Sequence, residues 1–148
     1  MLFNTDSISK VAYEDMNEVH LEEIVMANAI HDYLSQSVEH DQNRIEEMLK
    51  EFVFHVRDHF DYEEQMMKDS NCPILGCHES EHRRVLQLMF QVFRDFALAY
   101  DIQLLKDYFE YEFKTWIENH ILTMDTVTAT YLSNISNGEN IFLEGRDL

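Results

Sequence analysis

Helix breakers are scarce in this chain, and their scarcity limits the folds that are open to it. The 148 residues include three glycines and one proline, too few for the many tight turns of an all-β domain. Apolar residues instead recur every three or four positions along four long stretches, which is the spacing of one face of an α-helix. The pattern predicts an all-α fold with helices at residues 16–38, 42–69, 77–99 and 102–133.

The breaks between the predicted helices indicate how the helices are arranged. Asp41 is a suitable N-cap for the second helix, and Pro73 and Gly76 separate the second helix from the third. Because short connections place consecutive helices antiparallel, we expect an up-down-up-down antiparallel four-helix bundle. A chain of this length forms one hydrophobic core. The expectation is a single domain, 1–148, with a leader (1–15), the bundle (16–133) and a tail (134–148).

Polar residues occupy core positions on the predicted helices. On the second helix, His59 and Glu63 continue the stripe that Leu49, Phe52 and Val56 form. Histidine takes stripe positions on the other three helices as well: His20, His78, His82 and His120. On the fourth helix the stripe reads Phe113, Trp116, His120, Met124, Val127 and Tyr131. A stripe faces the core, so these polar side chains are predicted to be buried.

Antiparallel packing brings the polar stripe residues to one level of the bundle. The beginnings of the first and third helices lie beside the ends of the second and fourth, so all six residues fall within about two helical turns, at ~1.5 Å per residue. Each buried imidazole or carboxylate would cost several kcal/mol if it had no partner, more than a marginally stable domain tolerates. A shared metal satisfies them together, and the pattern therefore predicts a metal site.

Three other histidines are excluded from this site by their positions. His31 follows His20 by eleven residues, roughly 16 Å along a helix, and is predicted to be a core or boundary residue. His55 lies at the flank of the stripe and His40 lies in a connection. Both are predicted to be solvated rather than metal ligands.

Asp125 joins the site only if the fourth helix is distorted. It follows His120 by five residues, which is about 140° around an ideal α-helix and not on the same face. A π-type turn would bring the two side chains together, and such turns gather at functional sites. We therefore predict a distorted helix between them.

The charge of the chain excludes several classes of partner. The formal net charge is −18, which repels phosphate backbones and anionic lipids, so neither nucleic acid nor a membrane is expected as a partner. No apolar run is long enough to span a bilayer, and the opening MLFNTDSISK lacks the order of a secretion signal. The expectation is a cytoplasmic protein.

Two cysteines lie close together before the third helix. Cys72 and Cys77 are expected to be thiols in a reducing compartment. The segment CPILGCH, residues 72–78, is similar to a wide variant of the c-type haem attachment motif. Because that attachment occurs outside the cytoplasm, we predict no haem.

The polar stripe residues form a pattern that resembles the bacterial hemerythrins. A lone His20 is followed by HFDYE from His59, HESEH from His78 and HILTMD from His120, and the resemblance covers residues 16–132. Such a set of spacings is a specific signal.

The leader departs from the family pattern. Asn17 stands where the family usually carries an aspartate, and Thr5 is near the place of a usual tryptophan. Asn28, eight residues after His20, does match. The match favours His20 over His31 as the ligand from the first helix.

The resemblance implies two non-haem iron ions joined by an oxo or hydroxo bridge. One iron would be held by His78, His82 and His120, the other by His20 and His59, with Glu63 and Asp125 bridging both. The second iron would keep one open position for dioxygen. Four apolar residues would wall that position against water: Phe60, Trp116, Ile117 and Ile121. The implied function is reversible dioxygen binding for carriage or storage, not an enzymatic activity.

Two other functions remain open. A ferritin-like carboxylate di-iron oxidase or peroxidase would share the bundle but would use two Glu-x-x-His motifs, and the chain has one at the stripe, Glu79 to His82. A dioxygen or redox sensor would use the same site, with Cys72 and Cys77 beside His78 as a second input.

Overall fold

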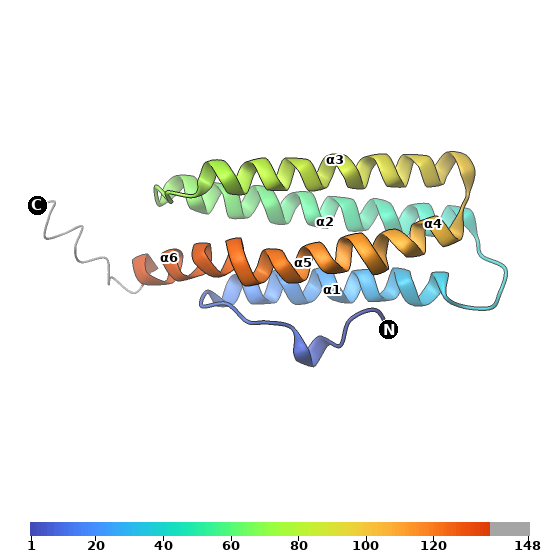
Figure 1. The fold of residues 1–148 in the computed structure, drawn as a ribbon, viewed down its shortest axis with the longest axis horizontal. Coiled ribbons are helices and arrows are strands. Elements are labelled where there is room, and N and C mark those ends of the chain that lie inside the picture. Colours follow the sequence, from blue (N-terminus) through green and yellow to red (C-terminus); the bar gives the residue numbers. More distant parts are fainter. Residues whose placement is uncertain (137–148) are drawn as a thin grey trace, which may run out of the picture.

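The computed structural model describes residues 1–136, and within that range it contains helices and no strand. The first three long helices are α1 (Glu14–Leu34), α2 (Gln42–Asp69) and α3 (Leu75–Ala99). A fourth, continuous rod is composed of α4 (Ile102–Asp107), η2 (Tyr108–Phe113), α5 (Lys114–His120), η3 (Ile121–Asp125) and α6 (Thr126–Ser136). The rods run alternately in opposite directions (Figure 1). The prediction of an all-α, up-down-up-down four-helix bundle is confirmed.

Capping side chains and left-handed residues separate the rods. Asp41 caps α2 as predicted, because its carboxylate accepts a hydrogen bond from the backbone N–H two residues later. Asp101 caps α4 through the N–H of Leu104 at 3.0 Å. Asn71 and Tyr100 take left-handed φ angles of 55° and 52°, which end α2 and α3 and turn the chain back.

The first helix is shorter than the sequence predicts. The apolar pattern extended it to residue 38, whereas α1 ends at Leu34. Val38, the last apolar residue of that pattern, is 57% exposed, so a longer helix would bury no apolar surface there. The connection is held by His40, whose Nε2 lies 2.8 Å from the carbonyl oxygen of Tyr33. The third helix begins at Leu75, two residues earlier than predicted, and most of the predicted tail, from residue 137, lies outside the described residues.

An N-terminal arm, residues 1–13, runs along α1 and includes η1 (Thr5–Ser7) (Figure 1). Two asparagines of α1 hold it by pairing with its backbone. Asn28 accepts a hydrogen bond from the N–H of Phe3 at 2.7 Å and donates one to the Phe3 carbonyl at 3.0 Å. Asn17 makes the same pair with Val11, at 2.8 and 3.0 Å. The arm is therefore fixed near both of its ends.

Aromatic rings fill the core beside the polar cluster. Phe52, Phe109 and Phe113 are fully buried and meet edge to face, with ring centroids 5.2 to 6.0 Å apart. Burying each of these rings stabilises the fold by about 1.5–3 kcal/mol. None of the helices in the described range combines the length and apolarity that crossing a membrane requires.

Candidate metal centre

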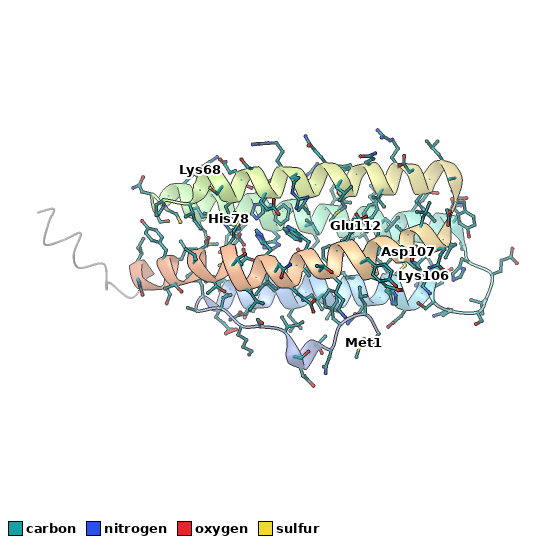
Figure 2. The ribbon with its side chains drawn as sticks, viewed as in Figure 1. Met1, Lys68, His78, Lys106, Asp107 and Glu112 are labelled. Atoms are coloured by element: carbon teal, nitrogen blue, oxygen red, sulfur yellow. The ribbon has the colours of Figure 1, made fainter. Side chains whose placement is uncertain are left out.

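All seven residues that the sequence predicts as metal ligands meet inside the bundle. Figure 2 shows His78 reaching from α3 into the interior between the rods. His59 is the most exposed of the seven and is only 6% exposed. Each rod contributes: His20 from α1, His59 and Glu63 from α2, His78 and His82 from α3, and His120 and Asp125 from the fourth rod. The level argument from the sequence therefore describes their placement correctly.

The five histidines divide into two groups around Glu63. The three-histidine group is His78, His82 and His120. One ring nitrogen of each histidine and one oxygen of Glu63 all lie within 4.8 Å of one another. The two-histidine group is His20 and His59, which with Glu63 meets the same limit. Each group therefore offers a set of ligand atoms compact enough for one metal ion.

Each of the two carboxylates faces both groups. Glu63 Oε1 lies 2.8 Å from His78 Nε2, while its Oε2 lies 3.0 Å from His59 Nε2. Asp125 Oδ1 lies 3.1 Å from His78 Nε2, while its Oδ2 lies 2.9 Å from His20 Nε2. Two oxygens of one carboxylate directed at two ligand groups is the arrangement of a bridging carboxylate.

Some of these closely placed atoms have no hydrogen-bond partner among the described residues. His20 Nε2, His82 Nε2 and Glu63 Oε1 are buried and have no hydrogen-bond partner. His78 Nε2 and His120 Nε2 lie 3.0 Å apart, and both lie beside the same Asp125 oxygen. Buried polar atoms are normally satisfied, so the convergence of nitrogen and oxygen atoms, three of which lack a hydrogen-bond partner in the described range, fits a cation at their centre.

The outward nitrogens of three ligand histidines have partners of their own. His59 Nδ1 lies 2.8 Å from Glu23 Oε2, and His82 Nδ1 lies 2.8 Å from Glu64 Oε2. His78 Nδ1 lies 3.1 Å from the hydroxyl of Thr128. Such partners fix which ring nitrogen carries the proton and leave Nε2 free for a metal.

The sequence interpretation missed these outer partners. Glu23 follows His20 by three residues and precedes the buried Ile24, so helical spacing alone could have placed it beside the core. Thr128 has the same relation to Asp125. The sequence gives no reason to single out Glu64, because it directly follows Glu63 and its spacing places it on no stripe.

Burial and the neighbouring charges shift the pKa values of the clustered histidines and carboxylates, in different directions for different residues. Burial lowers the pKa of His82 to about 3. Burial also acts against the charged form of His59, but the charge of Glu23 and its hydrogen bond outweigh burial and raise the pKa of His59 well above its usual value. Burial acts to raise the pKa of Asp125, but its close contacts with the imidazoles of His120, His20 and His78 outweigh burial and hold that pKa well below the usual range. The carboxylate is therefore ionised, which is the state that binds a metal.

A π-helical segment places Asp125 in the site, as predicted. In η3 the backbone N–H of Thr126 bonds to the carbonyl of Ile121, five residues earlier, in place of the α-helical four. The wider turn rotates Asp125 onto the face of His120, 3.2 Å from its Nε2.

The same segment makes one predicted core position wrong. Val127 belongs to the stripe that the sequence predicts for the fourth helix, yet it is 54% exposed. The extra residue in η3 shifts the buried face, so that Thr128, Ala129 and Leu132 are buried instead. A second π segment, η2, was not predicted.

Two of the four predicted wall residues contact candidate ligand rings. Phe60 stacks on His82 with ring centroids 3.8 Å apart, and Trp116 stacks on His120 at 4.5 Å. Ile117 and Ile121 are buried and line a cavity of about 450 Å³ beneath the N-terminal arm. The Trp116 indole N–H donates a hydrogen bond to Glu81 at 2.8 Å.

The remaining histidines lie outside both ligand groups. His31 Nε2 lies 2.8 Å from Glu110 Oε2, which is the boundary position expected for it. His55 is half-buried rather than solvated, and its Nδ1 lies 3.4 Å from the buried carboxylate of Glu23. That carboxylate explains why His55 is drawn inward. Cys72 is buried and Cys77 is exposed, and both are free thiols.

Comparison with known proteins gives matches over most of the chain. The family model described as the Hemerythrin HHE cation binding domain matches residues 11–132. A protein named bacteriohemerythrin from Aquifex aeolicus (strain VF5) is 25% identical over 134 residues, covering 90% of this chain and all of that protein. A second bacteriohemerythrin, from Ralstonia nicotianae (strain ATCC BAA-1114 / GMI1000), is 32% identical over 88 residues, 57% of this chain and 61% of its own length. No solved structure matches significantly.

Proposed function

Because this chain belongs to the hemerythrin HHE cation-binding domain family, we propose that it binds dioxygen reversibly at a non-haem di-iron centre. The observation that carries the proposal is the pair of carboxylates, each facing both histidine groups. Two metal ions bridged by Glu63 and Asp125 account for that geometry, whereas one ion would leave one histidine group without a partner. The curated relatives named bacteriohemerythrin support iron as the metal.

The unequal histidine groups support binding of a small molecule at one iron. In our proposal, one iron takes the three-histidine group and the other takes the two-histidine group. With both carboxylates and one oxo or hydroxo bridge, the three-histidine group would give its iron six ligands, and the two-histidine group would give its iron five. The open position on the second iron is the proposed site for dioxygen. When bound, the two irons supply the electrons that dioxygen accepts.

The protein's own side chains exclude water and hold the ligands in place. Phe60 and Trp116 stack on ligand rings, and Ile117 and Ile121 are buried on the fourth rod, close in sequence to His120. We propose that these four residues keep water away from the iron pair, as apolar walls do in many binding sites.

The surroundings of the site favour binding over oxidative catalysis. A ferritin-like enzyme would add glutamates to the centre, but Glu79, the carboxylate of the one such motif, lies 3.6 Å from Lys68 and is not among the ligand groups. Imidazole-rich ligand sets are neutral and stabilise high iron oxidation states less than carboxylates do. We propose that the protein is a carrier or store and not an enzyme.

The surface and the thiols support the remaining parts of the proposal. The net charge of −18 disfavours nucleic acid and anionic membranes as partners. Two free cysteines are typical of a reducing compartment, so we propose a cytoplasmic location.

Iron content and the visible spectrum together test the proposed function. The purified protein should hold about two irons per chain and no haem. Its spectrum should change on exposure to air and return when oxygen is removed. One iron per chain, zinc in place of iron, a positive haem assay or an irreversible change in air would each contradict the proposal.

A further inference from the structure

The two histidine groups differ in the outer carboxylates that support them. His59 of the two-histidine group is paired with Glu23, and His82 of the three-histidine group is paired with Glu64, both at 2.8 Å. The side chain of Glu23 is fully buried, whereas that of Glu64 is 20% exposed. The group with fewer imidazoles therefore has the more buried anion.

Glu23 is held in place from two sides. Its Oε2 faces His59 Nδ1 at 2.8 Å and His55 Nδ1 at 3.4 Å. Beyond His55 lies Glu22, which is 65% exposed and 3.6 Å from His55 Nε2. The other Glu23 oxygen, Oε1, is buried without a hydrogen-bond partner. Such a carboxylate is costly to bury.

We propose that Glu23 is a positioning residue of the di-iron centre, which holds His59 with Nε2 toward the metal and selectively strengthens the two-histidine half of the site. The inference rests on the proposed function, since it assigns a role at the iron where dioxygen would bind. Glu64 has the corresponding, weaker role at the three-histidine half.

The physical reason is the hydrogen bond on the far side of the imidazole ring. A carboxylate that accepts the Nδ1 proton fixes the tautomer and makes Nε2 a stronger donor to a metal, and its loss typically costs about 10–100-fold in metal affinity. A buried charge acts through a lower effective dielectric than an exposed one. Glu23 should therefore act more strongly than Glu64, and the structure offers no comparable anion to His20, whose Nδ1 has no hydrogen-bond partner.

Anaerobic titration of the metal-free protein with ferrous iron tests the inference. The parent should bind two irons in two steps. Glu23→Gln should weaken one step by about 10–100-fold, and Glu64→Gln should weaken the other step by less. Glu22→Gln removes the same charge from the neighbouring, exposed residue and should match the parent. Circular dichroism of each metal-free variant checks that the helices are retained.

Two readouts separate positioning from a merely structural role. Reductive titration of the iron-loaded protein should show that Glu23→Gln raises the reduction potential of one iron, because loss of a nearby negative charge favours the ferrous state, whereas Glu22→Gln should not. In the zinc-loaded parent, NMR should show His59 protonated at Nδ1, with that proton shifted downfield of the His20 Nδ1 proton by its hydrogen bond to Glu23. This second readout needs no variant, so it tests the inference even if Glu23→Gln does not fold.

The outcomes distinguish this inference from the proposed function. A parent that takes up fewer than two irons would overturn the proposed function. A parent with two irons, in which Glu23→Gln and Glu22→Gln have equal affinities and potentials, would overturn the role of Glu23 alone. His59 protonated at Nε2 in the zinc-loaded parent would overturn it as well.

Discussion

At the scale of single residues, function depends on polar side chains placed where apolar ones would pack. His20, His78 and Glu63 are each at most 1% exposed, and a fold without a use for them would replace them with apolar residues at a gain in stability. Their neighbours are arranged accordingly, with aromatic rings on the ligand imidazoles and carboxylates on the outward nitrogens.

Loss of a single ligand should remove metal. We expect His59→Ala and His82→Ala each to lower iron content markedly, because each ring belongs to one of the two ligand groups. His31→Ala is the matched control, since His31 pairs with Glu110 and belongs to neither group. Elemental analysis of the purified variants measures the effect, and full iron content in His59→Ala would contradict the ligand assignment.

The wall of the site should control the lifetime of the oxygenated protein. Ile121→Ser places a hydroxyl in an otherwise apolar wall, where it admits water, so the oxygenated spectrum should decay several-fold faster without loss of iron. Leu104→Ser is the control, because Leu104 lies on the same rod, is 64% exposed and does not line the cavity beneath the N-terminal arm. The decay rate is followed alongside iron content. Equal rates for the two variants would leave Ile121 as a packing residue only.

At the scale of elements, two irregular features build the site. The π segment η3 rotates Asp125 inward, and the N-terminal arm covers the cavity that Ile117 and Ile121 line. The arm has little structure of its own and relies on two asparagine side chains of α1. Their amide groups pair with the backbone N–H and carbonyl groups of the arm, as a neighbouring strand would do in a sheet.

Release of the arm should be measurable. Asn28→Ala removes two buried hydrogen bonds to Phe3, which should cost about 1–3 kcal/mol in the free energy of unfolding. Asn17→Ala, at a part-buried position, should cost less. Urea unfolding gives both values.

Proteolysis gives an independent measure of the same change. Lys10 is exposed in the arm, and trypsin should cut after it faster in Asn28→Ala than in the parent. Asn43→Ala, at an exposed position of α2 away from the arm, is the control. Unchanged cleavage and stability in Asn28→Ala would show that the arm is held by other contacts.

At the scale of the whole molecule, the bundle combines an aromatic core with a polar cluster that the fold alone does not satisfy. Phe52, Phe109 and Phe113 stabilise one region, while six of the seven predicted ligands form two buried groups that could each hold a metal ion. A metal that binds only the folded state adds its binding free energy to stability.

Metal removal should therefore destabilise the protein. With free metal at a thousandfold excess over its dissociation constant, each ion contributes about 4 kcal/mol to the free energy of unfolding, so chelation should lower the melting temperature by many degrees. Thermal unfolding before and after verified iron removal measures this. An unchanged melting temperature would mean that the cluster is satisfied without metal.

The sequence by itself determined the bundle and the level of the bundle at which the candidate metal ligands lie. The scarcity of helix breakers and the helical periodicity predict four rods, and the short connections predict their directions. All of these signals are local in the sequence. Counting residues along antiparallel helices placed His20, His59 and His120 at the same level, as the structure has them, because the rise per residue is constant along a helix.

Only the tertiary structure decided the rest, because it depends on contacts between distant segments. Val38 belongs to a local apolar pattern, but no neighbouring rod covers it, so α1 ends before it. The π segment η3 contains one extra residue per turn, which shifts the buried face and exposes Val127. The apolar periodicity of the sequence does not show that this shift occurs. The carboxylate of Glu23 meets His59 across two helices, 36 positions apart in the sequence, and only the packing of α1 on α2 brings them together.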